Sequence, residues 1–143
     1  MKVLPCDVTQ DWTFVNNKCI KLITDELPWQ DANAKCQALN GNLVVFHTIQ
    51  ELNNVINNIL PPTYAVWIGL TDLETSRVWK WVDGTQLTIN VWRDGEPSAA
   101  AQNCVSFLNG IYGINWNHNF NDDFCYKYCD FLCEKEPRES ANP

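Results

Sequence analysis

The chain has 143 residues, of which 45% are hydrophobic and 19% are charged, and its net charge is −7. This length suits one folded domain with a sizeable core, and the acidic balance argues against nucleic acid or an anionic membrane surface as a partner. No apolar run approaches the roughly 18 residues that a membrane helix needs, so no membrane insertion is expected. The negative charge is compatible with cation binding, although solubility alone also accounts for it.

Two helices are predicted in the first half of the chain. The first covers residues 28–39, with a proline in its first turn, Asn40-Gly41 after its end, and one apolar stripe made by Trp29, Ala32, Cys36 and Leu39. The second begins at Thr48, where Glu51 three residues later completes a capping-box pattern. Its apolar positions recur at helical spacing, and Pro61-Pro62 ends it.

Short strands and long polar loops are predicted in the second half. The expected strands cover residues 66–70, 78–82, 104–107 and 131–134, and Asp83-Gly84 is a turn signal. Residues 85–103 and 109–123 are expected to be irregular, and ordered loops of that length are usually functional. This order predicts an α+β fold in a single domain over residues 1–143, with a core at 6–134 and a flexible tail at 135–143.

The chain contains seven cysteines, which are Cys6, Cys19, Cys36, Cys104, Cys125, Cys129 and Cys133. This density is typical of disulfide-bonded proteins outside the cytosol, so we expect a secreted, extracellular protein. Zinc is the alternative, but the closest cysteines are separated by three residues, and His47 and His118 lie in no paired-ligand pattern. Disulfides are therefore favoured, and the odd count leaves one thiol over.

Several motifs in the chain resemble those of the C-type lectin-like domain family, in the family's order from Cys6 to Glu134. They comprise the Cys6–Cys19 segment of the long form, Trp67-Ile68-Gly69-Leu70, Trp79-Lys80-Trp81-Val82-Asp83-Gly84, Glu96-Pro97-Ser98, Phe120-Asn121-Asp122 before Cys125, and Cys133-Glu134. The resemblance implies the C-type lectin-like fold, with two helices, small antiparallel sheets and a long loop region anchored by a disulfide. It also implies the pairs Cys6–Cys19, Cys36–Cys133 and Cys104–Cys125.

Cys129 departs from the family pattern. It is either a buried free thiol or the link in a disulfide-bonded homodimer or heterodimer.

The resemblance implies one calcium site and carbohydrate binding. The ligand positions carried over are Glu96, Ser98, Gln102, Asn121 and Asp122, and the family holds the proline peptide cis, which makes Pro97 the candidate here. Calcium takes six to eight oxygen ligands, and vicinal sugar hydroxyls can supply two of them. Ser98 and Gln102 replace stronger ligands, so weak calcium binding is expected. The family's auxiliary site keeps Asp72 but has Ser76 and Ala99 where acids are usual, so we expect at most one Ca²⁺.

The sugar preference is expected to lean towards galactose or N-acetylgalactosamine, because serine-bearing triplets occur in galactose-binding members. Glu96, Ser98, Gln102 and Asn121 would also contact the sugar, Trp116 or Tyr112 could offer an aromatic face, and His118 could donate a hydrogen bond. A loop-packing role for Trp116 and a solvated His118 are the alternatives. The other six tryptophans are expected to be structural.

Two other classes of function stay open. Many domains of this fold have lost sugar binding and recognise a protein or ice, and Ser98, Gln102 and Cys129 are compatible with that change. The retained Glu96, Asn121 and Asp122 argue against it. Binding of sugar without calcium, or of a protein, at a degraded calcium site is the alternative function. No nucleophile-elbow, phosphate-loop or metal-hydrolase motif is present, so the chain is not expected to be an enzyme.

Overall fold

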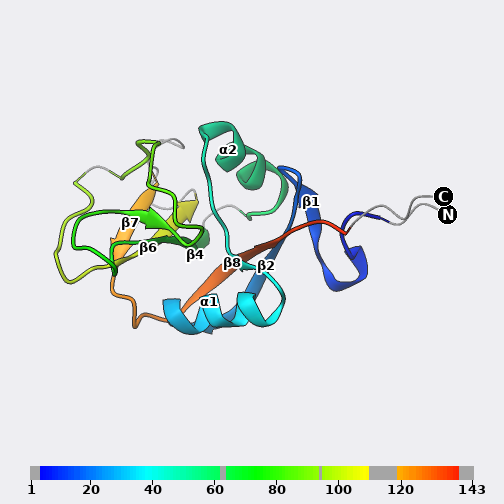
Figure 1. Cartoon of the computed structure of the whole chain (residues 1–143), viewed down its shortest axis with the longest axis horizontal. Coiled ribbons are helices and arrows are strands. Elements are labelled where there is room, and N and C mark those ends of the chain that lie inside the picture. Colours follow the sequence, from blue (N-terminus) through cyan, green and yellow to red (C-terminus); the bar gives the residue numbers. More distant parts are fainter. Residues whose placement is uncertain (1–3, 62–63, 94, 110–118, 139–143) are drawn as a thin grey trace.

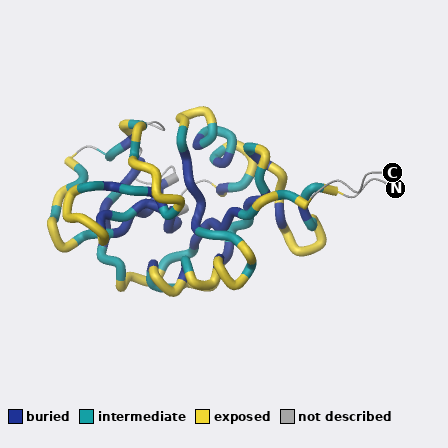
Figure 2. Tube along the Cα trace, in the orientation of Figure 1, coloured by how far each residue is buried: buried dark blue, intermediate teal, exposed yellow. Residues whose placement is uncertain are grey.

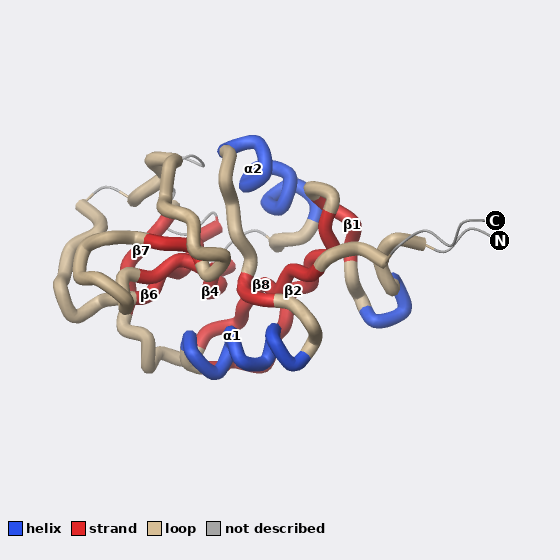
Figure 3. The backbone as a smooth tube through the Cα atoms, viewed as in Figure 1, coloured by secondary structure: helices blue, strands red, loops and turns tan. Residues whose placement is uncertain are grey.

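The computed structural model describes residues 4–61, 64–93, 95–109 and 119–138. Within these ranges the helices are η1 (Val8–Gln10, a 3₁₀ turn), α1 (Trp29–Ala38) and α2 (Ile49–Asn58). The strands are β1 (Thr13–Val15), β2 (Lys18–Leu27), β3 (Asn42–Leu43), β4 (Tyr64–Thr71), β5 (Lys80–Trp81), β6 (Cys104–Asn109), β7 (Phe120–Asp123) and β8 (Cys129–Lys135). The predicted α+β class is confirmed, and Figure 3 shows long loops gathered beside β6 and β7.

The strands join into one mixed sheet instead of separate small ones. Its order is β1-β2-β8-β4-β6-β7, with β3 added to β8 and β5 added to β4. Only β4 and β8 run parallel among the described strand pairs, and Trp67 of β4 lies opposite Phe131 of β8. This parallel pair joins the half of the sheet that carries both chain ends to the half that carries the loops (Figure 1).

The central strands are buried on both faces, because helices and loops cover both. Along β4, Val66 and Ile68 belong to one hydrophobic cluster while Trp67 between them belongs to another. Helix α1 packs its buried residues into the second cluster, and α2 packs into the first (Figures 1 and 2). Alternating side chains of one strand therefore serve two cores, as expected for a sheet covered on both sides.

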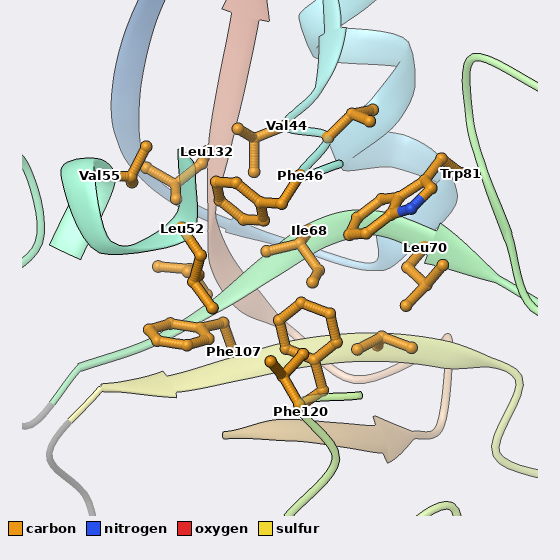
Figure 4. Close-up of a cluster of buried hydrophobic side chains, with 14 of the residues drawn as sticks. Val44, Phe46, Leu52, Val55, Ile68, Leu70, Trp81, Phe107, Phe120 and Leu132 are labelled. Atoms are coloured by element: carbon orange, nitrogen blue, oxygen red, sulfur yellow. The ribbon is translucent and has the colours of Figure 1, made fainter. Parts of the chain in front are cut away.

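Several aromatic rings pack together within the first hydrophobic cluster. Phe120 of β7 makes edge-to-face contacts with Trp81 at 6.0 Å, Phe107 at 6.2 Å and Trp92 at 6.3 Å between ring centroids. Figure 4 shows Phe120 with Trp81 and Phe107. Five of the tryptophans expected to be structural are buried, and the sixth, Trp92, packs partly buried against this cluster. The loop that carries Trp92 is thus tied to the sheet by its own side chains.

Both helices begin where their local signals predict. In α1, Trp29 is buried and its indole Nε1 donates a 2.8 Å hydrogen bond to the carbonyl of Ile68, which fixes the helix against β4. The capping box before α2 is present, since the Thr48 hydroxyl accepts from the Glu51 amide and the Glu51 carboxylate accepts from the Thr48 amide. These local interactions explain why the sequence pattern identified both helices.

Three disulfides join the pairs implied by the family resemblance. Cys36 of α1 bonds to Cys133 of β8 across 97 residues, and Cys104 bonds to Cys125 across 21 residues. The third, Cys6–Cys19, closes the amino-terminal segment. The Cys104–Cys125 bond joins the first residue of β6 to a residue just after the end of β7. Strands β6 and β7 border the loop region.

Two strand expectations need correction. The strand expected over residues 78–82 is ladder-paired only at Lys80–Trp81. Residues 120–123, expected to be irregular, form β7 and pair with β6 in the antiparallel register Phe107↔Phe120 to Cys104↔Asp123.

In the parts of the chain that the structure describes, no helix has the length and apolar character needed to cross a membrane.

Candidate functional site

The first half of the long loop is held against β7 by backbone hydrogen bonds. The Phe120 amide donates to the carbonyl of Val91, and the Arg93 amide donates to the carbonyl of Phe120, both at 2.8 Å. The Glu96 amide then donates to the carbonyl of Arg93 at 2.9 Å, which closes a turn. These bonds carry the triplet beginning at Glu96 to the side of β7, although 24 residues separate Ser98 from Asp122.

The end of the loop is held by Asn103 against the end of β4. The carbonyl of Asn103 accepts from the Thr71 hydroxyl at 2.6 Å and from the Asp72 amide at 3.1 Å. Its side-chain amide donates to the Asp72 carboxylate at 2.9 Å. Hydrogen bonds therefore hold both ends of the segment 96–102 against the sheet, and binding residues are often found on loops that a rigid scaffold positions in this way.

The carboxylate of Asp122 is the centre of a polar cluster. Its side chain is fully buried and accepts from the Ser98 amide at 3.0 and 3.1 Å and from the Ala99 amide at 3.3 Å. The guanidinium of Arg77 approaches one of its oxygens at 3.8 Å. One buried carboxylate therefore fixes the loop through two amides while it stays beside a cation.

Glu96 lies next to this carboxylate. The Glu96–Pro97 peptide is cis, as expected from the resemblance. Burial, followed by the nearby carboxylate of Asp122, raises the pKa of Glu96 above its usual range, although Ser98 opposes this shift. Its Oε2 atom is buried and has no hydrogen-bond partner in the described parts of the chain. Two carboxylates held together with one buried oxygen unsatisfied form an arrangement that a cation would stabilise.

Ser98 and Gln102 complete the polar cluster. The Ser98 hydroxyl donates to Oε1 of Gln102 at 3.3 Å. The structure therefore brings four of the five predicted calcium ligands together, and we call Glu96, Ser98, Gln102 and Asp122 the loop cluster. All four present oxygen atoms, which hard cations prefer.

The fifth predicted ligand, Asn121, lies elsewhere. It lines a small cavity with Ser106 and Cys129, while its neighbour Asp122 belongs to the loop cluster. Successive side chains of a strand point to opposite faces, which accounts for this separation. The predicted sugar contacts Tyr112, Trp116 and His118 lie outside the described residues.

The cluster is short of charge for a strong metal site. Within the described ranges, no three His, Cys, Asp or Glu side chains gather where they could hold a metal ion. The loop cluster offers two carboxylates, one amide oxygen and one hydroxyl. Low charge among the ligands lowers calcium affinity, so the residues fit a weakly bound calcium ion better than a tight one.

Asp72, the acid retained from the family's auxiliary site, has a structural role here. Its carboxylate accepts from the Arg77 amide at 2.8 Å and from the Asn103 side chain. Arg77 has a left-handed backbone with a φ of 65°, and its guanidinium lies beside Asp122. Sequence reasoning missed Arg77, because its approach to a carboxylate 45 residues away leaves no local pattern.

Cys129 has no disulfide partner. It is half-buried at the start of β8, and burial, followed by the negative charge of Asp123, raises the pKa of its thiol to about 11. At neutral pH this thiol is almost entirely protonated and so is a poor nucleophile. The interchain disulfide considered for Cys129 stays a prediction.

The fold and the loop cluster together define a disulfide-bonded recognition domain whose polar site is carried on a long anchored loop. The family comparison agrees: the profile of the Lectin C-type domain matches residues 25–135, and the chain belongs to this family. Its members are generally binding proteins and not enzymes.

Individual relatives share this fold over most of the chain. C-type lectin 1 of Hydrophis hardwickii is 31% identical over 92% of this chain and 82% of its own length. The carbohydrate-recognition domain of cow CD23, solved in the presence of a GlcNAc2Man3 oligosaccharide, is 26% identical, with a TM-score of 0.79 over 96% of this chain and all of the other. A calcium-independent type II antifreeze protein has the same TM-score over 95% of this chain and 98% of its own, and at 21% identity it shows the fold alone.

Several other curated relatives are much longer. The chain spans between 7% and 62% of their lengths. The similarity to them therefore concerns one domain of each protein.

Proposed function

We propose that this domain binds carbohydrate at the loop cluster through a weakly held calcium ion. The observation that carries the proposal is the buried Oε2 of Glu96, which lies beside the buried carboxylate of Asp122 and has no hydrogen-bond partner in the described structure. Burying adjacent carboxylates is unfavourable unless a positive charge compensates. A calcium ion supplies that charge and leaves coordination positions for sugar hydroxyls.

Glu96, Ser98, Gln102 and Asp122 would hold the ion, whereas the side chain of Asn121 lines a cavity away from them. A bound calcium ion would offer coordination positions to two hydroxyl oxygens of a sugar, and side chains of the loop cluster would bond to the hydroxyl protons. Carboxylate oxygens accept such protons, and the amide group of Gln102 can both donate and accept. The loop cluster could therefore distinguish sugars by the direction of their hydroxyl groups.

Calorimetry and affinity chromatography test this function directly. Titration with Ca²⁺ is expected to give a dissociation constant of roughly 10⁻⁴–10⁻³ M, as in extracellular modules. The protein is expected to stay on a sugar column in calcium and to elute with EDTA. No heat with calcium, together with no retention on any sugar, would refute the proposal.

The sugar preference proposed here is for galactose-type sugars. The cow CD23 domain was solved with an oligosaccharide that contains mannose, so immobilised mannose is the natural comparison. Retention on galactose that is stronger than on mannose would support the preference. The reverse order would exclude it and leave calcium-dependent binding intact.

Replacing Arg77 with serine is expected to tighten calcium binding by about two- to five-fold, the range for an exposed ion pair. The guanidinium stands 3.8 Å from Asp122 and competes with a metal for that charge. Because Arg77 is partly exposed, the effect is modest. Calorimetry measures it, and Lys80→Ser, which removes a cation paired with exposed Glu74, is the control. Equal calcium affinity in the Arg77 variant and the wild type would exclude this competition.

Calcium binding is expected to weaken on acidification, and the weakening should begin at a higher pH than it would if the pKa of Glu96 were that of an ordinary glutamate. Because the pKa of Glu96 is raised, its carboxylate takes up a proton earlier as the pH falls. The protonated carboxyl group is neutral and therefore binds calcium poorly. Calorimetry from about pH 7.5 to about pH 5 measures the trend. A flat calcium affinity over this interval would remove Glu96 from the ligand set.

A second function, binding of sugar or a protein without calcium, is favoured by one observation. Asp122 already accepts two loop amides and lies beside Arg77, so the loop is held in place by the chain's own groups. Elution from a sugar column by free sugar but not by EDTA would support this alternative.

Three further expectations accompany the proposal. The disulfides support a secreted, extracellular protein. A disulfide-linked dimer through Cys129 would be detected by comparing reducing and non-reducing gels. No hydrolysis is expected on a panel of simple esters and glycosides.

A further inference from the structure

Two tyrosines are exposed on the turn between β7 and β8, which we call the tyrosine turn (residues 124–128). Tyr126 is 70% exposed and Tyr128 is 68% exposed, the largest fractions among the described large hydrophobic side chains. Figure 1 shows this turn, in orange, beside the start of α1, and Figure 2 shows that much of it is exposed. The loop cluster makes no use of these rings. Tyrosine is enriched at protein interfaces, so the tyrosine turn is a candidate contact surface.

The tyrosine turn is fixed by a covalent bond and by packing. Cys125 is bonded to Cys104 of β6, and its carbonyl accepts a 2.9 Å hydrogen bond from the Trp29 amide at the start of α1. The ring of Phe124 stacks on that of Tyr126, with 5.2 Å between the ring centroids and 19° between the ring planes. A partner that binds here therefore meets a surface that is already ordered, which lowers the entropy cost of binding.

Carboxylates are concentrated near the end of the tyrosine turn, where Cys129 follows it. The pKa of the Cys129 thiol is raised mainly by burial and then by the negative charge of Asp123. Asp130 and Glu26 raise it further, while Lys127 opposes the shift. Three carboxylates and one ammonium group thus lie close enough to this position to act on it.

The cations beside the turn are already engaged. Lys127 forms an ion pair with Asp123 at 3.2 Å, and Arg93, which lines the same cavity as Cys129, has an interaction of its own within the fold. Glu26 and its neighbour Asp25 are exposed on β2. The exposed charge beside the tyrosine turn is therefore negative, and it favours a positively charged partner.

We propose that the tyrosine turn binds an arginine-rich segment of another protein. A guanidinium group can lie flat on the exposed face of a tyrosine ring, and the carboxylate of Glu26 adds attraction for the same charge. Tyr126 and Tyr128 are two residues apart, at most about 7 Å along the chain, so one extended segment can reach both rings. This interaction goes beyond the proposed carbohydrate binding.

Other occupants suit the tyrosine turn less well. The chain has ten Lys and Arg residues, no two of them adjacent in sequence, so it contains no arginine-rich segment of its own. A second copy, with a net charge of −7, would bring negative charge to a negative surface. A neutral glycan could stack on the rings, but it would gain no ion pair with Glu26.

Fluorescence anisotropy with a labelled oligoarginine peptide tests the proposal, at about 0.15 M ionic strength to screen attraction to the net charge alone. The double variant Tyr126→Ser/Tyr128→Ser is expected to weaken binding by about five- to thirty-fold, the factor for losing two exposed cation–π contacts. Phe14→Ser, which changes an exposed aromatic residue on β1, should leave the peptide affinity unchanged. An oligolysine peptide of the same length should bind less tightly than oligoarginine.

A second pair of variants tests the contribution of the carboxylates. Glu26→Gln should weaken binding of the oligoarginine peptide by about two- to five-fold, as expected for an exposed ion pair. Glu74→Gln removes the same charge from an acid that is paired with Lys80 elsewhere on the surface, and it should have no effect.

Equal peptide affinity in the double tyrosine variant and the wild type, or an equal loss in Phe14→Ser, would overturn the proposal. Self-association that the double variant abolishes would overturn it in favour of a second copy. Reduced retention of the double variant on a sugar column, with peptide binding unchanged, would overturn it in favour of a glycan. EDTA should leave peptide binding intact, so failure of this proposal is distinguishable from failure of calcium-dependent carbohydrate binding.

Discussion

Replacing Glu96 with glutamine is expected to weaken calcium binding by at least about tenfold, because the number of charged ligands sets the affinity of such sites over several orders of magnitude. The substitution keeps the size of the side chain but removes one of the two carboxylates in the loop cluster. The amide of the new glutamine can also donate a hydrogen bond to the carboxylate of Asp122. This bond removes the carboxylate–carboxylate repulsion that favours calcium binding in the wild type. Calorimetry with Ca²⁺ measures the loss, and sugar-column retention should fall with it.

Two matched variants make this result specific. Glu74→Gln removes an equal charge from an acid whose side chain is 75% exposed, and it should leave calcium affinity unchanged. Gln102→Glu adds a carboxylate to the loop cluster and should strengthen binding, which a misfolded protein could not do. If Glu96→Gln bound calcium as tightly as the wild type while Gln102→Glu gained nothing, the ion would have to bind elsewhere.

Removing the Cys36–Cys133 disulfide is expected to lower the free energy of unfolding by roughly 4–5 kcal/mol. The bond closes 97 residues, and a cross-link over so long a segment strongly restricts the unfolded chain. The double variant Cys36→Ala/Cys133→Ala avoids a new thiol at this buried position. Urea denaturation followed by tryptophan fluorescence measures the change.

The Cys6–Cys19 disulfide is the internal comparison. Its cysteines are also buried, but it closes 13 residues, so its removal should cost about 3 kcal/mol. Equal losses in the two double variants would show that loop length does not control the stabilisation, and that local packing around the bonds does.

The helices were predictable from sequence because their signals are local. The capping box at Thr48 and the stop at Asn40-Gly41 lie within a few residues of the ends that they determine. Strand β7 had no such signal, since Phe120–Asp123 contains two acids and one amide. Asp122 is buried there because amides of Ser98 and Ala99 reach it from a distant loop, and only the folded structure shows that contact.

The candidate site was predictable where its residues belong to local sequence motifs. The family motifs identified Glu96, Ser98, Gln102 and Asp122, and the structure brings these four together. The motif alone does not show that strand alternation places Asn121 with Ser106 on the cavity side, away from Asp122. The cation beside Asp122 is Arg77, which lies far from Asp122 in the sequence, so no local sequence pattern indicated their approach.

The two ends of the described chain lie side by side. The Arg138 amide and side chain donate to the carbonyls of Pro5 and Leu4, and in Figure 1 this junction is at the far end of the domain from β6 and β7. A tether attached at either end would therefore leave the domain at one pole and leave the opposite pole unobstructed. Several copies arrayed on a common stalk could all face outward, and weak single contacts would then add up through avidity.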